Sequence, residues 1–236
     1  MVKVANNNSD SSFYNLRFER KFVYTEQDAD DIIDTIVFTN KFCFKEIYSR
    51  RRVNSIYFDD NNLTFYRMNV SGDGIREKFR IRWYGDDFSL LSNPTIEVKK
   101  KFGEVGDKYS YKINDFSLDL KYYTVDKFNS LFQTKIMEPK LASKFNCIFP
   151  TLYNSYERRY FLSDCGKFRI TIDYNMVFYN PNAKDFELSK STLSDVILEL
   201  KYNTEDDKKA REVAQTFKTR LSKNSKYIRG FEMFNY

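Results

Sequence analysis

The sequence predicts an α+β protein whose antiparallel strands close into a barrel around a polar lumen, with helices packed outside. Three observations lead to this prediction. Several segments alternate charged and apolar residues with period 2, which is typical of strands with two different faces. The charged faces are mostly cationic, whereas a solvated face normally mixes signs because like charges on neighbouring strands destabilise pairing. Helical segments can cover the apolar faces, which turns the cationic faces inward if the sheet closes.

The first elements are a strand, a helix and a second strand. Residues 14–24 alternate with period 2, and Arg17, Glu19 and Lys21 share one face of the expected strand. We expect Thr25 to cap a helix. The apolar face of this helix is formed by Ile32, Ile33, Ile36 and Val37. A second strand is expected over 53–60, after the run Arg50, Arg51 and Arg52, and then a turn or short helix.

The central segments predict the clearest strands. Residues 74–85 place four cations on one face, namely Arg76, Lys78, Arg80 and Arg82. Residues 94–103 and 106–113 form an expected hairpin about a glycine-bounded turn. The charged face of the first hairpin strand carries Glu97, Lys99 and Lys101, and that of the second carries Lys108, Ser110 and Lys112.

The C-terminal half returns from helix to strand. The spacing of Phe128, Leu131, Phe132 and Ile136 predicts a helix within 114–146. Strands are expected over 154–163, 166–179 and 196–202, the last with Glu199 and Lys201 on its charged face. A polar helix is expected over 205–221. Its inner stripe is formed by Ala210, Val213, Ala214 and Phe217.

Composition sets limits on chemistry and location. The 236 residues include 39 Lys and Arg, 33 Asp and Glu, and no histidine, so mechanisms and metal sites that need histidine are excluded. We expect a disordered leader over 1–13 and a single domain over 14–236. No apolar run approaches a membrane span, no secretory signal is recognisable, and the three cysteines are far apart. These features predict a cytoplasmic protein without a membrane segment of its own.

A lumen lined by many cations predicts a compact, highly charged anion as its ligand. Packing such charges together costs several kcal/mol unless an anion compensates them, and mixed Arg and Lys suit a chain of phosphates. Nucleic acid is disfavoured, because a duplex needs an open basic surface. Glu19, Glu97 and Glu199 would orient the cations or hold one hard divalent metal, Mg²⁺ or Mn²⁺, with Glu199 the preferred ligand.

The ordered motifs resemble the VTC domains, which are polyphosphate polymerase domains related to the CYTH proteins among the triphosphate tunnel metalloenzymes. The resemblance spans about residues 14–232. It is carried by ERKF (19–22), VNSIYFDD (53–60), REKFRIRWYG (76–85), IEVKKKFG (96–103), the strand with Arg158, KFRITID (167–173), LELK (198–201) and KNSKYIRG (223–230). It implies an eight-stranded antiparallel tunnel and transfer of the terminal phosphate of ATP to polyphosphate, with Mn²⁺ or Mg²⁺.

The resemblance also implies residue roles. The catalytic set falls on Lys21, Arg80, Arg82, Lys99, Arg158 and Arg169. Further substrate contacts fall on Arg76, Lys78, Lys108, Lys112, Lys223, Ser225 and Lys226, and the metal ligand is Glu199. Two matches stay open: one basic position is Lys108 or Lys112, and one arginine is Arg67 or Arg76.

One departure from the relatives argues against the triphosphate or cyclic-nucleotide chemistry of CYTH proteins. CYTH proteins carry Glu-x-Glu-x-Lys on the first strand, where this sequence has Arg17, Glu19 and Lys21. The leading hypothesis is therefore an ATP-dependent polyphosphate polymerase that acts on ATP and polyphosphate. A triphosphatase using water as acceptor and a non-catalytic polyphosphate-binding module are the alternatives.

Overall fold

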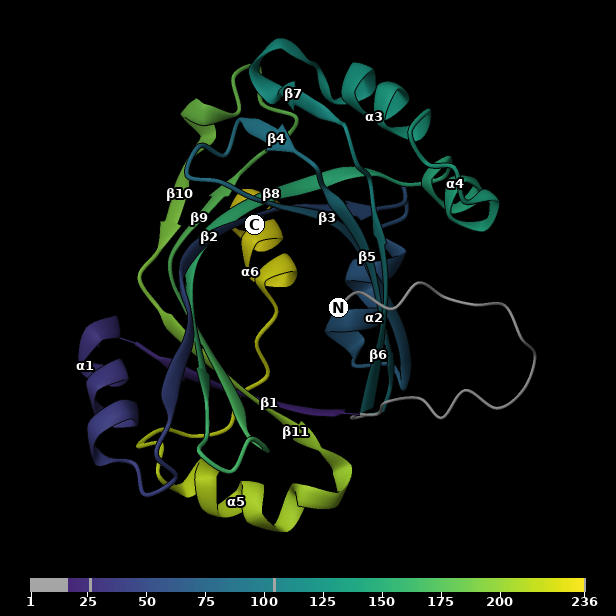
Figure 1. Ribbon diagram of the computed structural model, residues 1–236. Helices are drawn as coiled ribbons and strands as arrows, with labels where there is room; N and C mark the ends of the chain where they lie inside the picture. The colour runs from purple at the N-terminus through teal and green to yellow at the C-terminus, as the bar shows by residue number, and fades with distance from the viewer. Residues whose placement is uncertain (1–16, 26, 104, 236) are drawn as a thin grey trace.

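A computed structural model describes residues 17–25, 27–103 and 105–235. The expected leader and the start of the first strand lie outside these residues. Eight antiparallel strands follow one another in a ring in the order β8–β9–β11–β1–β6–β5–β3–β2 and back to β8 (Figure 1). The expected tunnel architecture is thereby confirmed. The closure is unequal, because β1 and β6 pair through one residue pair among those described, Arg17 with Gly106.

The strands of the ring differ in length. They are β1 (Arg17–Tyr24), β2 (Lys45–Asp59), β3 (Ile75–Tyr84), β5 (Thr95–Phe102), β6 (Val105–Lys112), β8 (Phe149–Leu162), β9 (Arg169–Tyr179) and β11 (Val196–Asn203). The short strand β10 (Ser191–Leu193) pairs with β9, and β4 (Leu90–Ser92) pairs with β7 (Ser117–Asp119) in a separate sheet. The long β2–β8 ladder extends the second strand to Lys45, so the arginines at 50–52 lie within a strand, not before one.

Helices pack around the ring, mostly on its apolar outer faces. They are α1 (Ala29–Asp34), α2 (Thr64–Ser71), α3 (Val125–Gln133), α4 (Pro139–Phe145) and α5 (Asp207–Gln215). The α1 helix continues as a π-helix over Thr35–Thr39, and 3₁₀ turns occur at Leu120–Tyr122, Glu187–Ser189 and Thr204–Asp206. One apolar cluster joins α3 and α4 to β2, β3 and β5, and another joins α1 and α5 to β1, β9 and β11.

Two helix boundaries differ from the sequence expectation. The cap of α1 is Asp28, whose carboxylate accepts a hydrogen bond from the Asp30 amide, so the cap lies three residues after the expected Thr25. The α5 helix ends at Gln215, well before the expected residue 221. Of the expected inner stripe, Ala210 and Val213 are buried in the helix, and Phe217 is buried just beyond its end.

A sixth helix, α6 (Lys226–Asn235), has no counterpart in the sequence expectation. It lies within the outline of the ring in Figure 1 and packs on inner side chains of β2, β8, β9 and β11. The Tyr227 ring stacks on Tyr57 with 5.3 Å between centroids. Across the described residues, no helix is long and apolar enough to cross a membrane.

Candidate functional site

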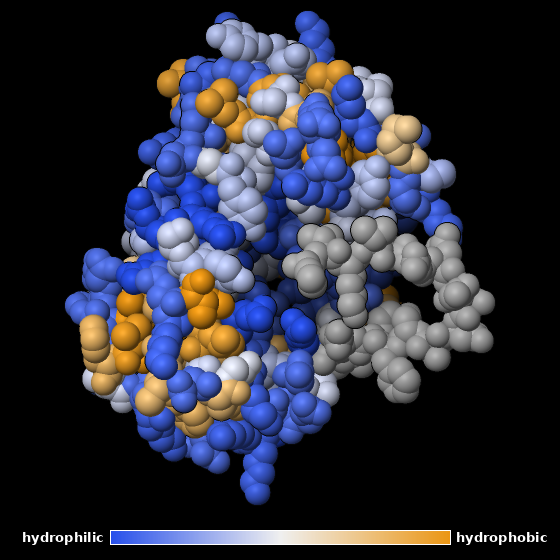
Figure 2. Space-filling view, in the orientation of Figure 1, coloured by the Kyte–Doolittle hydropathy of each residue, from blue (hydrophilic) through white to orange (hydrophobic). Residues whose placement is uncertain are grey.

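A cavity of about 350 Å³ lies inside the ring, and its charge is strongly one-sided. Among the described residues, twelve Lys and Arg but only three Asp and Glu line it. Figure 2 shows hydrophilic residues around the hollow on this face. The cationic lining is Arg17, Lys21, Lys78, Arg80, Arg82, Lys99, Lys101, Lys108, Arg158, Arg169, Lys201 and Lys226. The acidic lining is Glu19, Asp107 and Glu199.

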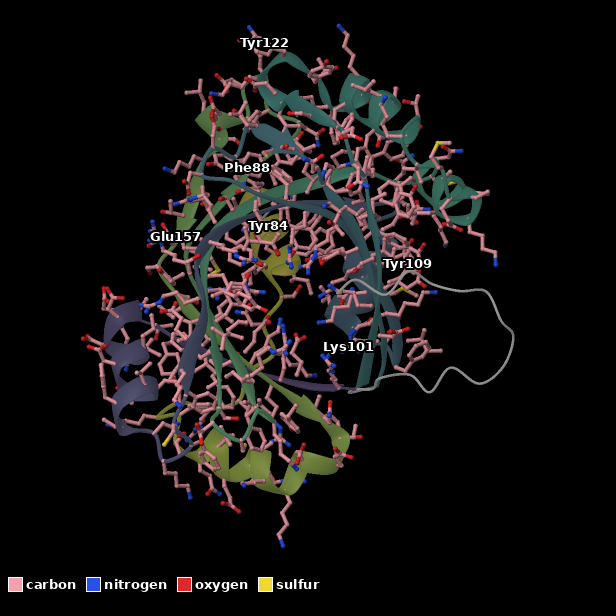
Figure 3. The ribbon with its side chains drawn as sticks, viewed as in Figure 1. Tyr84, Phe88, Lys101, Tyr109, Tyr122 and Glu157 are labelled. Carbon is pink, nitrogen blue, oxygen red and sulfur yellow. The ribbon has the colours of Figure 1, made fainter. Side chains whose placement is uncertain are left out.

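Strand periodicity places these side chains. On β3 the alternate residues Lys78, Arg80 and Arg82 turn inward, whereas Phe79 and Ile81 are buried on the outer side under the helices. The same alternation turns three further pairs of charged side chains toward the cavity. They are Lys99 and Lys101 of β5, Glu19 and Lys21 of β1, and Glu199 and Lys201 of β11. In Figure 3, Lys101 marks the ring's inner edge and Tyr109 lies on the outer side of β6.

Glu199 is the most heavily paired carboxylate in the cavity. Its oxygens lie 3.2 Å from Lys21 Nζ, 3.0 Å from Lys201 Nζ and 3.7 Å from Arg158 Nη2. Burial alone would raise the pKa of Glu199, but the charges of Lys201, Lys21 and Arg158 outweigh it, so the pKa lies well below the usual range. Glu199 is therefore ionised at neutral pH.

Glu19 and Glu97 hold further cations in place. Glu19 lies 2.7 Å from Lys99 Nζ and 3.5 Å from Lys21 Nζ. Glu97 lies 2.6 Å from Arg80, 2.9 Å from Lys108 and 3.6 Å from Arg82. Burial alone would raise the pKa of both carboxyls, but the charges of these cations outweigh it. The pKa of each therefore lies below its usual range, and both carboxylates are ionised.

Asp173 fixes the inner end of the cavity. Its fully buried carboxylate accepts hydrogen bonds from Arg158 Nε at 2.5 Å, from Arg158 Nη2 at 2.6 Å and from Lys226 Nζ at 2.5 Å. Because Arg158 belongs to β8 and Lys226 to α6, this carboxylate ties the helix to the ring. It leaves the outer side of the Arg158 guanidinium available to the cavity.

Several lining cations lack an acidic partner among the described residues. Lys78 Nζ donates to Ser225 Oγ at 2.8 Å, and neither Lys101 nor Arg169 forms an ion pair within the described part of the chain. Burial, together with the charges of Lys21 and Lys99, lowers the pKa of Lys78 well below its usual value. Burial also lowers the pKa of Lys99 to about 8, although Glu19 opposes the shift. These unpaired cations repel one another, and an anion in the cavity would offset that repulsion.

The donor set fits a divalent metal only together with a ligand. No group of three or more acidic or thiol side chains is placed to hold a metal within the described residues. Glu19 and Glu199 do converge on one cation, Lys21 Nζ. Mg²⁺ is commonly held by one or two carboxylates plus substrate phosphates, so these two carboxylates suit such an ion. The metal-binding role of Glu199 stays a prediction.

Most of the predicted site residues meet in this cavity. They are Lys21, Lys78, Arg80, Arg82, Lys99, Lys108, Arg158, Arg169, Glu199, Ser225 and Lys226. Three do not line it: Arg76 donates to the Asp73 carbonyl near the start of β3, and Lys112 and Lys223 are exposed. Of the open pairs, the cavity takes Lys108 and neither Arg67 nor Arg76. Their phosphate-binding roles remain predictions.

Two tyrosines of the lining were not predicted. Tyr156 Oη accepts a hydrogen bond from Arg82 Nη2 at 3.2 Å, and Tyr57 Oη accepts one from Arg80 Nη1 at 3.4 Å. Tyr57 lies in a predicted strand, between the apolar Ile56 and Phe58. This alternation could have indicated that Tyr57 faces the inside of the ring. Both tyrosines orient the arginine pair of β3.

A separate cavity of about 400 Å³ lies outside the ring, between the α1 segment and residues 216–218. Its described lining includes Tyr24, Thr39, Asn40 and Thr216, with Asp31 and Lys218 as its charged members. It lacks the cationic character of the ring cavity, so its described lining does not suit a chain of phosphates.

Comparisons with known proteins agree with this architecture. The family model described as VTC domain matches residues 16–235. A candidate adenylate cyclase from Vibrio parahaemolyticus superposes with a TM-score of 0.51 and 12% identity, covering 89% of this chain and 95% of that one. A candidate adenylyl cyclase from Hippeastrum, HpAC1, described as having a dominant triphosphatase activity, gives a TM-score of 0.54 and 11% identity over 92% and 95%. None of the curated proteins matches the sequence significantly.

Proposed function

The chain belongs to the VTC domain family, and on this premise we propose that it is a metal-dependent polyphosphate polymerase. It would transfer the terminal phosphate of ATP to the end of a polyphosphate chain inside the ring. The observation that carries the proposal is the cavity with twelve cations against three acids among its described lining. A linear polyphosphate supplies the compensating charge along the length of such a cavity.

Phosphoryl transfer suits a site without a protein nucleophile. The terminal oxygen of the acceptor chain attacks the γ-phosphorus of ATP, the bond to the bridging oxygen breaks, and ADP leaves with that oxygen. The protein contributes positioning and charge neutralisation, which account for most of the catalysis in this type of reaction. Arg80, Arg82 and Arg158 are held by Glu97 and Asp173, so they are preorganised for the transferring phosphoryl group.

The remaining proposed roles follow from position in the cavity. Lys21, Lys99 and Arg169 would neutralise the other phosphates, and Ser225 and Lys226 would contact the donor end. Glu199, with Glu19 beside it, would hold Mn²⁺ or Mg²⁺. When bound, such an ion polarises phosphate oxygens and neutralises developing charge. Lys21, which lies between the two carboxylates, would then be free to turn toward phosphate.

A triphosphatase is the second candidate, and one observation favours it. The Hippeastrum protein that shares the fold is described as having a dominant triphosphatase activity. In that reaction water takes the place of the acceptor chain, and the same cations serve. A polyphosphate-binding module without turnover is the third candidate, although it would not need the ionised Glu199.

The experiment is incubation of the purified protein with ATP and Mn²⁺, followed by gel separation of phosphate chains and a free-phosphate assay. The polymerase proposal predicts chains that lengthen with time as ADP accumulates. Free phosphate without chains would overturn it in favour of a triphosphatase. Tight binding of polyphosphate without consumption of ATP would favour the binding module.

A further inference from the structure

A tyrosine–arginine cluster lies on the inner face of the ring, one step beyond the cationic cavity. We call it the rim cluster, and it consists of Tyr48 and Arg51 of β2, Tyr84 of β3 and Tyr160 of β8. Tyr84 is the next inward residue after Arg82 on β3, and Tyr160 is the next after Arg158 on β8. The rim cluster therefore continues the cavity wall toward one end of the ring.

The three tyrosine rings surround a single guanidinium. Arg51 Cζ lies 5.0 Å from the ring centroid of Tyr48, 5.7 Å from that of Tyr84 and 5.8 Å from that of Tyr160. Tyr48 and Tyr160 meet edge to face, with 5.6 Å between centroids and an interplanar angle of 86°. Arg51 forms no ion pair with any acid of the described chain, in contrast to Arg50 and Arg52, which both pair with Glu157.

The rim cluster is in contact with the site. Arg158 Cζ lies 5.2 Å from the ring centroid of Tyr156 in the cavity and 5.9 Å from that of Tyr160 in the rim cluster. The Arg158 guanidinium, which faces the cavity, thus packs against one tyrosine of the cavity and one of the rim cluster. A molecule held by Arg158 through a phosphate therefore has the rim cluster directly beside it.

Two of the three tyrosines of the rim cluster are about half exposed to solvent. Tyr48 is 52% exposed and Tyr84 is 51% exposed, and both stand beside an exposed guanidinium. A chain of inorganic phosphates has no planar group that could stack on an aromatic ring. Planar bases, in contrast, stack on tyrosine rings and on guanidinium planes, with little dependence on which base is present.

We propose that the rim cluster binds the base of a nucleoside triphosphate, so that the phosphates enter the cavity and the base stays at the rim. The nucleoside joins base and phosphates through one ribose, which suits a base site adjacent to Arg158. This inference rests on the proposed function, because it assigns the nucleoside end of the same substrate. It gives the protein a means to distinguish a nucleoside triphosphate from an inorganic chain.

The test compares ATP with inorganic tripolyphosphate by titration calorimetry in EDTA, which prevents metal-dependent turnover. Tyr84→Ala should lower the affinity for ATP about 5- to 150-fold, the range for loss of one stacking contact. Its affinity for tripolyphosphate should change less than about twofold, since no phosphate contact is lost. Tyr84→Phe, which keeps the ring, should bind ATP like the wild type.

Two further variants guard the interpretation. Tyr48→Ala removes a second exposed ring and should repeat the selective loss for ATP if Tyr84→Ala folds poorly. Tyr109→Ala removes a 48% exposed tyrosine on the outer side of β6 and should change neither affinity (Figure 3). Equal losses for ATP and tripolyphosphate, or no loss for ATP, would overturn the inference while the proposed function stands. Failure of the wild type to bind tripolyphosphate would overturn both.

Discussion

The Asp173 carboxylate offers the sharpest test of how the cavity is held together. It is fully buried and neutralises two cations from different elements, Arg158 of β8 and Lys226 of α6. Asp173→Asn keeps the shape but leaves two buried cations without their shared anion. Removal of one partner of a buried ion pair costs about 3–5 kcal/mol. For a chain of this size, that corresponds to a fall of about 6–20 °C in the melting temperature.

The assay is urea and thermal unfolding of wild type and Asp173→Asn without phosphate. The matched control is Asp164→Asn, which removes a surface pair with Lys45 at 3.0 Å, where both side chains are more than two-thirds exposed. The control should change the free energy of unfolding by less than about 0.5 kcal/mol. Saturating tripolyphosphate should recover part of the stability of Asp173→Asn, since it supplies the missing negative charge. A loss below about 1 kcal/mol in Asp173→Asn would show that its carboxylate does not hold Arg158 and Lys226 in place.

Three further predictions follow from other parts of the cavity. Glu199→Gln should reduce turnover of ATP with Mn²⁺ at least about 100-fold while tripolyphosphate binding measured in EDTA is kept, and wild-type turnover would remove the metal assignment. The affinity for tripolyphosphate should fall as pH rises through about 8, because Lys99 loses its charge there. Lys99→Arg should flatten this part of the pH profile, and an identical profile in both proteins would contradict the role of Lys99. Gly230→Ala should destabilise the fold by about 1–3 kcal/mol, because the added Cβ would overlap the Phe178 side chain and lie 2.7 Å from Leu152 Cδ2. An unchanged unfolding curve would show that α6 packs less tightly on the strands.

The inward cations of the strands could be predicted because strand periodicity is local. Alternation alone placed Lys78, Arg80 and Arg82 on one face of β3, and the structure turns that face to the cavity. The same rule failed at the ends of strands, where a face is no longer enclosed. Arg76 shares that face but bonds to the Asp73 carbonyl near the start of β3, and Lys112 is exposed at the end of β6.

Ser225 and Lys226 were predicted as site residues, but the helix α6 that follows Ser225 was missed, for a different reason. Tyr227, Phe231 and Phe234 stand at helical spacing, which was the available signal for α6. The surface that stabilises this short helix comes from four strands distant in sequence, so local pattern gives little indication of its place. Asp173 ends the motif KFRITID, and no role was predicted for it. Its role depends on the meeting of β8, β9 and α6, which only the tertiary structure brings about.

The central claim is that the cationic cavity of the ring binds a chain of phosphates. Its most direct test is titration calorimetry of inorganic tripolyphosphate with wild type and with Arg80→Ala, whose loss leaves Glu97 paired with Arg82 and Lys108. Loss of a charge-assisted contact costs about 1.5–3 kcal/mol, so we expect saturable binding by the wild type that weakens about 10- to 150-fold in Arg80→Ala. Absence of binding by the wild type, or equal affinity in both proteins, would contradict it.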